Sequence, residues 1–307
     1  ACLVGSEMCI RDRFRSYISS YTTNTYTFGY TSAGSSFRNT EDTIVGSIFT
    51  CPDDGQAQSI TAYIGMTTAA KNMKCAIYKH SDLSLVAQTE QRSVPISTGW
   101  QTFNFVDPKP TLTANTEYLL VAWSASGSGN ANLYYYTYGS YNQGHYKSQT
   151  YDTNFPNPLS SPTHDSYRYS IYCTYKKANC VSEVEFTGSS TSSDWSWVEW
   201  KVDSAWTASS VSVTLQFYNW ATSSYPTSGD GYISYTSGSA NIDETRSQTI
   251  TANPNNFREA GTGNWKIKIK GEKTGTQFDF KGDLIQLYLS YMGGLSPGFE
   301  IASNADD

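Results

Sequence analysis

Alternation of apolar and polar residues with a period of two is the feature that most limits how this chain can fold. Short runs with this period recur about every ten to fifteen residues from Tyr26 to Tyr291, separated by Gly, Pro, Asn, Asp or Ser. Between Val211 and Phe217, for example, every second residue is apolar. Helical periodicity is nearly absent, and only Asn253 to Gly261 favours a single turn. The pattern predicts an all-β fold of antiparallel strands.

Ten of these runs end by Lys176 and eight begin at or after Glu183, with the segment KKANCVS between them. A chain of 307 residues is long enough for two domains that each bury a core. We therefore predict two tandem antiparallel β-sandwich domains of jelly-roll type, at residues 22–177 and 178–292, and a polar tail at 293–307.

The first residues need separate treatment. The stretch ACLVGSEMCIRDR, residues 1–13, resembles the translation of a sequencing adapter, and residues 1–21 are predicted to be an artefact or the remnant of a leader. The true start is then missing, so the lack of a signal peptide proves nothing. Cys2 and Cys9 also leave the cysteine count.

Charge and hydropathy exclude some classes of partner. The net charge is −6, and no run of Lys or Arg exceeds two residues, so we expect no nucleic-acid partner. The longest apolar run, Tyr118 to Trp123, is far too short to span a bilayer. With 15% aromatic and only 16% charged residues, the composition is typical of an extracellular or cell-surface β protein that does not itself span a membrane.

Four cysteines remain as disulfide candidates: Cys51, Cys75, Cys173 and Cys180. An even number fits an oxidising compartment and allows three connectivities, which the sequence does not rank. Free thiols buried on strands are the alternative.

The sequence offers little support for catalysis. The three histidines, His80, His145 and His164, are isolated and lack metal-ligand spacing, so no catalytic zinc site is expected. Glu183 and Glu185 share one strand face, as a glycosidase pair could, but solvated strand charges are the simpler interpretation. We therefore predict that the chain is not an enzyme.

Acidic residues beside glycines leave one cofactor open. Such residues occur in CPDDG, SGDG and NIDE, and they are Asp53, Asp54, Asp230 and Asp243. Their oxygens could hold a structural calcium ion, although turn chemistry explains each of them equally well. No other cofactor is expected.

Two aromatic groups are the candidate contact surfaces for carbohydrate or protein. In DWSWVEWKVDSAW, alternation directs Trp200 into a core and leaves Trp195 and Trp197 facing outward, near Trp206. In NLYYYTYGSYNQGHY, Tyr134, Tyr136 and Tyr138 face one way. Amphipathic rings of this kind are typical of contact surfaces. Burial of both strand faces beneath a loop or a neighbouring domain is the alternative for the tryptophans.

Longer stretches carry a resemblance. FTCPDDGQAQSITAYIG, KCAIYKHSDLSLVAQTE, TGWQTFNF, LTANTEYLLVAW and SIYCTY resemble a β-sandwich module of large secreted and cell-surface proteins of archaea and bacteria. EVEFTG, SVTLQFYNW, YPTSGDGYISY, ITANPNNFREAGTGNWKIKIKG and FDFKGDLIQLY resemble a second module that accompanies them. The resemblance implies a surface or extracellular role without a settled activity.

These observations favour a non-catalytic extracellular or cell-surface structural protein. It would act by self-association or adhesion, as a subunit of a filament, sheath or surface layer, with copies of itself or other surface proteins as partners. The alternative is a carbohydrate-binding protein, or the binding module of a larger glycan-active enzyme. A hydrolase is the third class.

Overall fold

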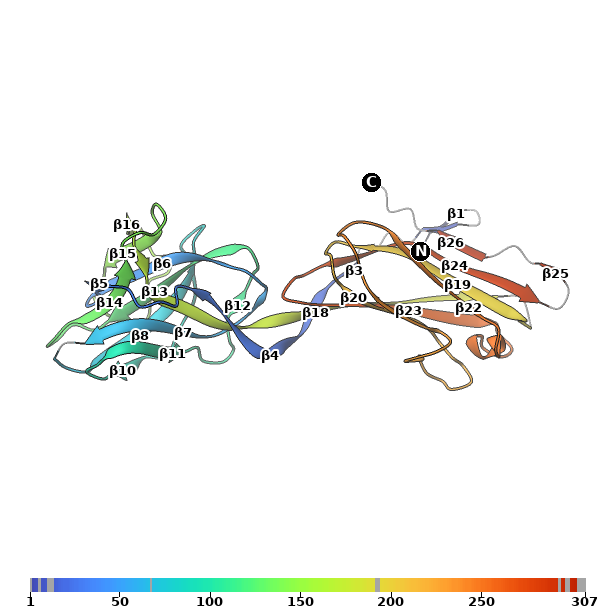
Figure 1. The fold of residues 1–307 in the computed structure, drawn as a ribbon, viewed down its shortest axis with the longest axis horizontal. Helices are drawn as coiled ribbons and strands as arrows, with labels where there is room; N and C mark the ends of the chain where they lie inside the picture. Colours follow the sequence, from blue (N-terminus) through green and yellow to red (C-terminus); the bar gives the residue numbers. More distant parts are fainter. Residues whose placement is uncertain are drawn as a thin grey trace. The chain divides into compact units, whose positions relative to one another are not determined.

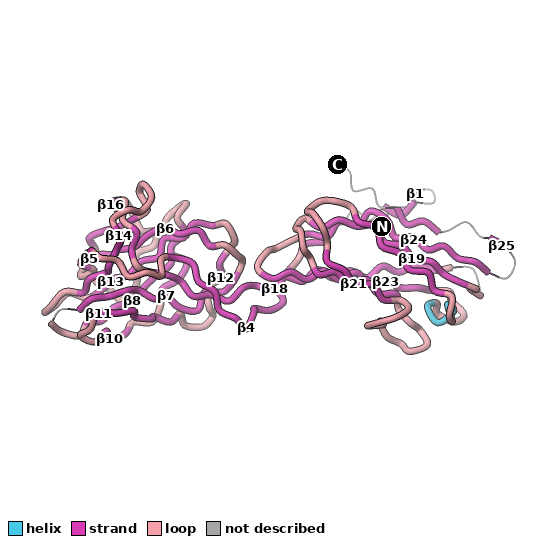
Figure 2. The backbone as a smooth tube through the Cα atoms, in the orientation of Figure 1, coloured by secondary structure: helices cyan, strands magenta, loops and turns pink. Residues whose placement is uncertain are grey.

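The structure, a computed structural model of the chain, consists almost entirely of β-strands (Figures 1 and 2). It describes residues 2–4, 7–9, 14–66, 68–190, 194–291, 294–295 and 299–302. Among these residues, helix is limited to one 3-10 turn, η1 (Pro254–Phe257), drawn in cyan in Figure 2. The all-β fold class predicted from the alternation is confirmed, and η1 lies within the segment that favours a turn.

The chain divides into two compact units. The first unit is Tyr21–Ala178, and the second is Asn179–Asp307 together with Ala1–Ser20. Strand β18 (Ile171–Ser189) pairs with the first unit through its early residues and with the second through its later ones.

Two antiparallel sheets form the first unit (Figure 1). The β6 sheet has the order β10-β8-β13-β6-β15-β16, with β9 also on β8. Its strands are β6 (Thr43–Cys51), β8 (Lys71–Lys79), β9 (Leu85–Gln88), β10 (Arg92–Val94), β13 (Thr116–Ser124), β15 (Gly144–Ser148) and β16 (Thr163–Asp165).

The β7 sheet has the order β17-β14-β7-β18, with β5 on β14, β11 and β12 on β7, and β4 on β18. Its other strands are β4 (Tyr17–Gly29), β5 (Ser36–Asn39), β7 (Gly55–Met66), β11 (Thr98–Asn104), β12 (Thr111–Leu112), β14 (Ala131–Tyr136) and β17 (Arg168–Tyr169).

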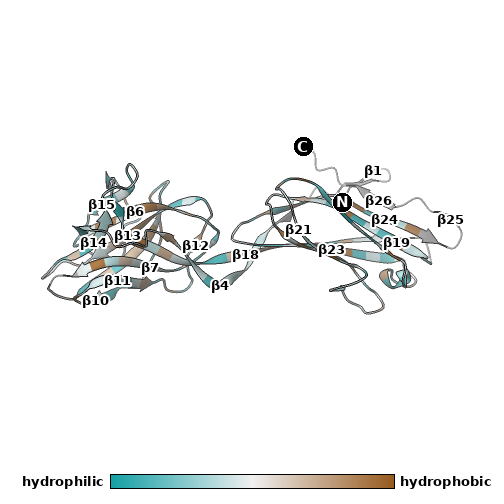
Figure 3. Cartoon of the chain, in the orientation of Figure 1, coloured by the Kyte–Doolittle hydropathy of each residue, from teal (hydrophilic) through white to brown (hydrophobic). Residues whose placement is uncertain are grey.

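The core of the first unit lies between these two sheets. Alternation along β7 directs Ile60 and Ile64 into it, where they join Val45 of β6 and Leu120 of β13, all fully buried. Apolar residues, brown in Figure 3, recur along these strands. Removing this surface from water is the main force that holds the sandwich together.

The outer face of the β6 sheet is covered as well. Trp123, Tyr78 and Leu119 point away from the central core and pack against Phe155 and Leu159, which lie between β15 and β16. Strands of the β6 sheet are therefore buried on both sides.

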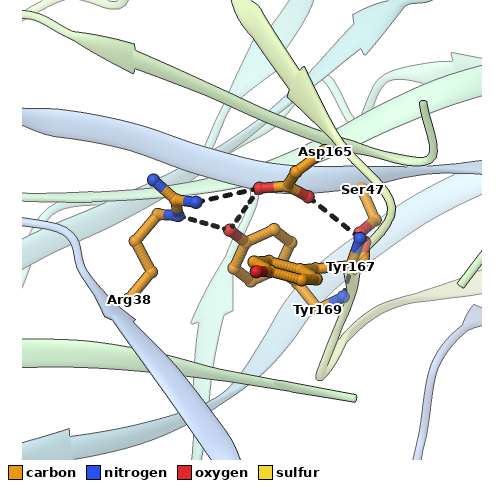
Figure 4. A network of polar contacts seen from close by, with 5 residues as sticks. All are labelled: Arg38, Ser47, Asp165, Tyr167 and Tyr169. Carbon is orange, nitrogen blue, oxygen red and sulfur yellow. Dashed lines mark hydrogen bonds and ion pairs between the residues drawn. The ribbon is translucent and has the colours of Figure 1, made fainter. Parts of the chain in front are cut away.

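A polar network fixes the edges of the first unit (Figure 4). Arg38 donates to the hydroxyl of Tyr169 (2.7 Å) and to Asp165 Oδ2 (3.0 Å). The backbone N–H of Tyr167 donates to Asp165 Oδ1, and that of Tyr169 donates to Ser47 Oγ. Burial and the nearby Asp165 carboxylate raise the pKa of Tyr169 above its ordinary value. The network ties β5 to β16 and β17.

The second unit is also built from two sheets. The β23 sheet has the order β18-β23-β20-β21, and the β19 sheet has the order β22-β19-β24 with β3, β25 and β26 on β24. The strands are β3 (Phe14–Arg15), β19 (Trp197–Trp206), β20 (Ser212–Phe217), β21 (Tyr232–Thr236), β22 (Glu244–Ile250), β23 (Asn264–Thr274), β24 (Asp279–Tyr291), β25 (Gly294–Leu295) and β26 (Phe299–Ala302).

Alternation places the core of this unit too. Trp200, Phe217 and Ile267 are fully buried. On the other face of β23, Lys266 and Lys268 point away from the core.

Both ends of the chain contain paired strands. In the region 1–21, β1 (Cys2–Val4) pairs with β2 (Glu7–Cys9), and β3 pairs with β24. In the region 293–307, β25 and β26 pair with β24. The adapter origin of residues 1–13 stays a prediction.

Candidate functional site

The outer face of the β7 sheet carries a continuous group of aromatic side chains. Phe37, Tyr134, Tyr63, Trp100 and Tyr172 come from β5, β14, β7, β11 and β18, and we call them the aromatic face. Successive ring centroids are 5.6, 5.2, 5.2 and 5.3 Å apart. The exposed fraction is 56% for Phe37 and 36% for Trp100. Each ring therefore contacts the next while part of the group stays open to solvent.

Strand register brings these rings together. Trp100 lies directly opposite Tyr63, and Tyr134 lies directly opposite Phe37. A Cβ atom on Gly65 would come within 2.8 Å of the Tyr134 ring. The absence of a side chain at Gly65 therefore makes room for this ring. Because Ile60 and Ile64 point into the core, Tyr63 must point out of the sheet.

Hydroxyl groups accompany the rings. Thr61 and Thr102 are hydrogen-bonded to each other at 2.9 Å on the same face. Among the described residues, no hydrogen bond engages the phenol groups of Tyr63, Tyr134 or Tyr172. The aromatic face thus offers apolar rings for stacking and phenol groups for new hydrogen bonds, and Arg168 lies beside Tyr136 at its edge, 5.8 Å from the ring centroid.

The predicted tyrosines lie beside or within this face. Tyr134 belongs to it, and Tyr136 and Tyr138 extend it at the end of β14 with ring centroids 5.5 Å apart. Their exposed fractions are 39% and 78%. Tyr135 points to the opposite side, where it stacks on Tyr167 with centroids 4.2 Å apart. The sequence analysis did not single out Phe37, Tyr63, Trp100 and Tyr172, because they lie on four different strands and only the pairing of these strands brings their rings together.

The predicted tryptophan platform is wrong for two of its three members. Trp195 and Trp206 are each only 2% exposed. Trp195 precedes β19, so strand alternation does not govern it, and it packs against Phe217 in the core. Trp206 has the same parity as the buried Trp200 and therefore points inward. Trp197 is half-buried.

The predicted disulfides among Cys51, Cys75, Cys173 and Cys180 do not form, and all four of these side chains are buried. Cys51 lies opposite Thr116 of β13 and Cys75 lies opposite Ala122 on the other side of the same strand. They are therefore about 20 Å apart along the strand direction, far beyond the ~7 Å that a disulfide spans. Cys173 lies on β18 in the opposite sheet. Burial raises the pKa of Cys51 to about 12, so its thiol stays protonated.

The acidic residues proposed for calcium have other contacts. Asp53 accepts from the Tyr175 hydroxyl and pairs with Lys177, both at 2.9 Å. Asp54 accepts from the backbone N–H of Ala114 at 2.8 Å. Asp230 and Asp243 are exposed residues of the second unit. No group of three metal-ligating side chains occurs in the described part of the chain. A structural calcium ion stays a prediction.

The two glutamates considered for hydrolysis belong to ion pairs. Glu183 lies 3.9 Å from Lys268, and Glu185 lies 3.8 Å from Lys266. The hydroxyl of Tyr225 also donates to Glu185. These contacts are the ordinary charge pairing of neighbouring strands.

The structure corrects the expectation that the histidines are isolated. His145 and His164 are direct cross-strand partners with ring centroids 4.3 Å apart, and the His80 ring lies 5.7 Å from that of His145. His80 Nδ1 lies 2.9 Å from Glu117 Oε2, and the carboxylate accepts a hydrogen bond when this nitrogen carries a proton. Burial, followed by the neighbouring His164 and His80, lowers the pKa of His145 to about 4.

Comparisons with known proteins add little. No protein family matches the chain, and no curated protein matches it. One similar structure is a protein of Parabacteroides distasonis that is assumed to be secreted, with 9% identity, a TM-score of 0.30, and coverage of 91% of this chain and 97% of that one.

A second is the N-terminal CBM22-1–CBM22-2 tandem domain of Paenibacillus barcinonensis Xyn10C, with 10% identity, a TM-score of 0.23, and coverage of 91% and 98%. A third is infectious bursal disease virus, strain Gx, with 11% identity, a TM-score of 0.21, and coverage of 94% and 76%. TM-scores of this size carry no argument about function.

Proposed function

We propose that the chain is a non-catalytic extracellular or cell-surface binding protein whose aromatic face binds carbohydrate chains. One observation carries the proposal: rings from five strands form an unbroken group on one sheet face, with Phe37 and Trp100 exposed to solvent. The described residues contain no helix long and apolar enough to cross a membrane.

The length of the row of rings and the angles between them support a single glycan chain as the ligand. Four rings on neighbouring strands, spaced about 4.8 Å apart, extend over about 14 Å, which suits several successive sugar units. Neighbouring rings are inclined by 52 to 85°, so they form a corrugated surface and not a flat wall. Sugar rings present apolar C–H faces and hydroxyl edges, which match aromatic faces and free phenol groups.

A binding assay with matched variants tests this proposal. Isothermal titration of the full chain against a panel of soluble, neutral polysaccharides is expected to give saturable binding to at least one. Trp100→Ala is expected to weaken that binding at least tenfold, or about 1.4 kcal/mol. Tyr288→Ala is the control, because Tyr288 is equally exposed, at 36%, but belongs to the second unit. Equal affinity of the Trp100 and Tyr288 variants would contradict the proposal.

Self-association is the second candidate, and the exposed tyrosines of the first unit favour it. The exposed fractions of Tyr138 and Tyr141 are 78% and 87%, which is unusual for such large rings. Sedimentation velocity of the full chain over a wide concentration range tests it. Oligomers that disappear in a Tyr138→Ser/Tyr141→Ser variant would support assembly, and a strictly monomeric chain would oppose it.

A further inference from the structure

All three histidines of the chain meet at one place in the first unit. They line a pocket of about 550 Å³ together with Glu117 and Tyr141. His80 follows β8, His145 lies on β15, and His164 lies on β16. The pocket therefore joins the middle of the β6 sheet to its β15–β16 edge.

His145 lies between the other two rings and is only 2% exposed. Its ring is nearly perpendicular to both neighbours, at 87° to His80 and 81° to His164. Within the described structure, His145 Nδ1 is buried without a hydrogen-bond partner. A charged imidazole here would lack both water and a counter-ion, so this environment favours the neutral ring.

Few charges nearby could compensate a positive His145. Glu117 is the acid that lines the pocket, and it contacts His80 instead. On β16, the Asp165 carboxylate already forms an ion pair with Arg38. On β15, Lys147 is positively charged, and its ammonium group donates to the Ser160 hydroxyl. No Lys or Arg lines the pocket within the described ranges.

We propose that His80, His145 and His164 form an acid-sensitive latch that holds the β15–β16 edge at neutral pH and releases it on acidification. The Glu117 carboxylate contacts His80, so a positive charge on that ring has a counter-ion. Protons on two or more of the three rings place like charges within 4.3 to 5.7 Å of one another, with the His145 ring buried. Repulsion and the loss of solvation both favour separation of β15 and β16 from the sheet.

The sign of the effect follows from linkage. The unfolded chain protonates its histidines near pH 6.5, whereas buried His145 resists protonation in the folded unit. Between pH 6.5 and about pH 4, the pKa of His145 in the folded unit, the unfolded state binds more protons than the folded state. The free energy of unfolding therefore falls as pH falls through this range. We expect the equilibrium constant for opening to rise on the order of a hundredfold between pH 7 and pH 4.5.

Ring titration by nuclear magnetic resonance tests the latch directly, because only three histidine signals exist. In the full chain, we expect the His145 ring to take up its proton well below the ordinary histidine range. Amide exchange, corrected for intrinsic rates, is expected to accelerate in β15 and β16 between pH 7 and pH 4.5, and to stay unchanged in the second unit.

Two variants separate the latch from general acid damage. His80→Gln and His164→Gln change surface-side rings, so the chain is expected to fold as the wild type at pH 7, which circular dichroism checks. On acidification from pH 7 to pH 4.5, the amide exchange rate in β15 and β16 is expected to increase in each variant by a factor at least three times smaller than in the wild type. Ordinary titration of all three rings, or equal acid response in the wild type and both variants, would overturn the proposal.

Discussion

At the scale of single residues, burial decides which groups keep their ordinary chemistry. Lys74 is only 1% exposed, and its ammonium group lies 4.9 Å from the ring centroid of Trp123 and 5.1 Å from that of Phe155. It also donates to the backbone carbonyl of Asp152. Burial lowers the pKa of Lys74 to about 8, and Asp152 opposes this shift.

This buried lysine gives a pH dependence with a definite sign. Between pH 8 and 10.5 the unfolded chain keeps the proton on Lys74 and the folded chain releases it, so its contribution to the free energy of unfolding rises with pH. We expect urea denaturation of the wild type, compared with Lys74→Met at each pH, to show this rise. A difference that stays flat or falls between pH 7.5 and 9.5 would mean that Lys74 is not desolvated.

At the scale of elements, one strand shows where alternation can be trusted. Within β19, alternation separates Trp200, which is fully buried, from Trp197, which is half-buried. Trp195 lies two residues before Trp197, and alternation predicts that it faces outward like Trp197. It is buried instead, because β19 begins only at Trp197 and the alternation does not extend to Trp195. A period-two pattern predicts orientation inside a strand, but the sequence does not mark where the strand starts.

Trp197 and Trp200 of β19 make a matched pair for a stability test. Trp200→Ala removes a ring that packs 5.8 Å from Phe217, and it is expected to lower the free energy of unfolding by about 3–5 kcal/mol. Trp197→Ala, on the other face of the same strand, is expected to cost distinctly less. Chemical denaturation of both variants measures the difference, and equal losses would place the core on the wrong face of β19.

At the scale of the whole molecule, the sequence predicts the fold class and the orientation of side chains better than it predicts which residues of different strands are in contact. The all-β class follows from local alternation, and so does the outward orientation of Tyr134. The neighbours of Tyr134 do not, because Tyr63 and Trp100 reach it only through pairing of β7 with β14 and β11. The histidine cluster likewise depends on the register of β15 with β16 and on the approach of His80 from a distant part of the chain, and no local spacing encodes either.

Oxidative footprinting of the full chain, with and without a saturating polysaccharide, tests the central claim most directly. Hydroxyl radicals modify exposed aromatic rings, and mass spectrometry locates the modified residues. The account predicts protection of Trp100, Tyr63 and Tyr134 by bound glycan, with Tyr288 oxidised equally in both samples. Protection confined to Trp197 or other residues of the second unit, with the aromatic face unchanged, would contradict it.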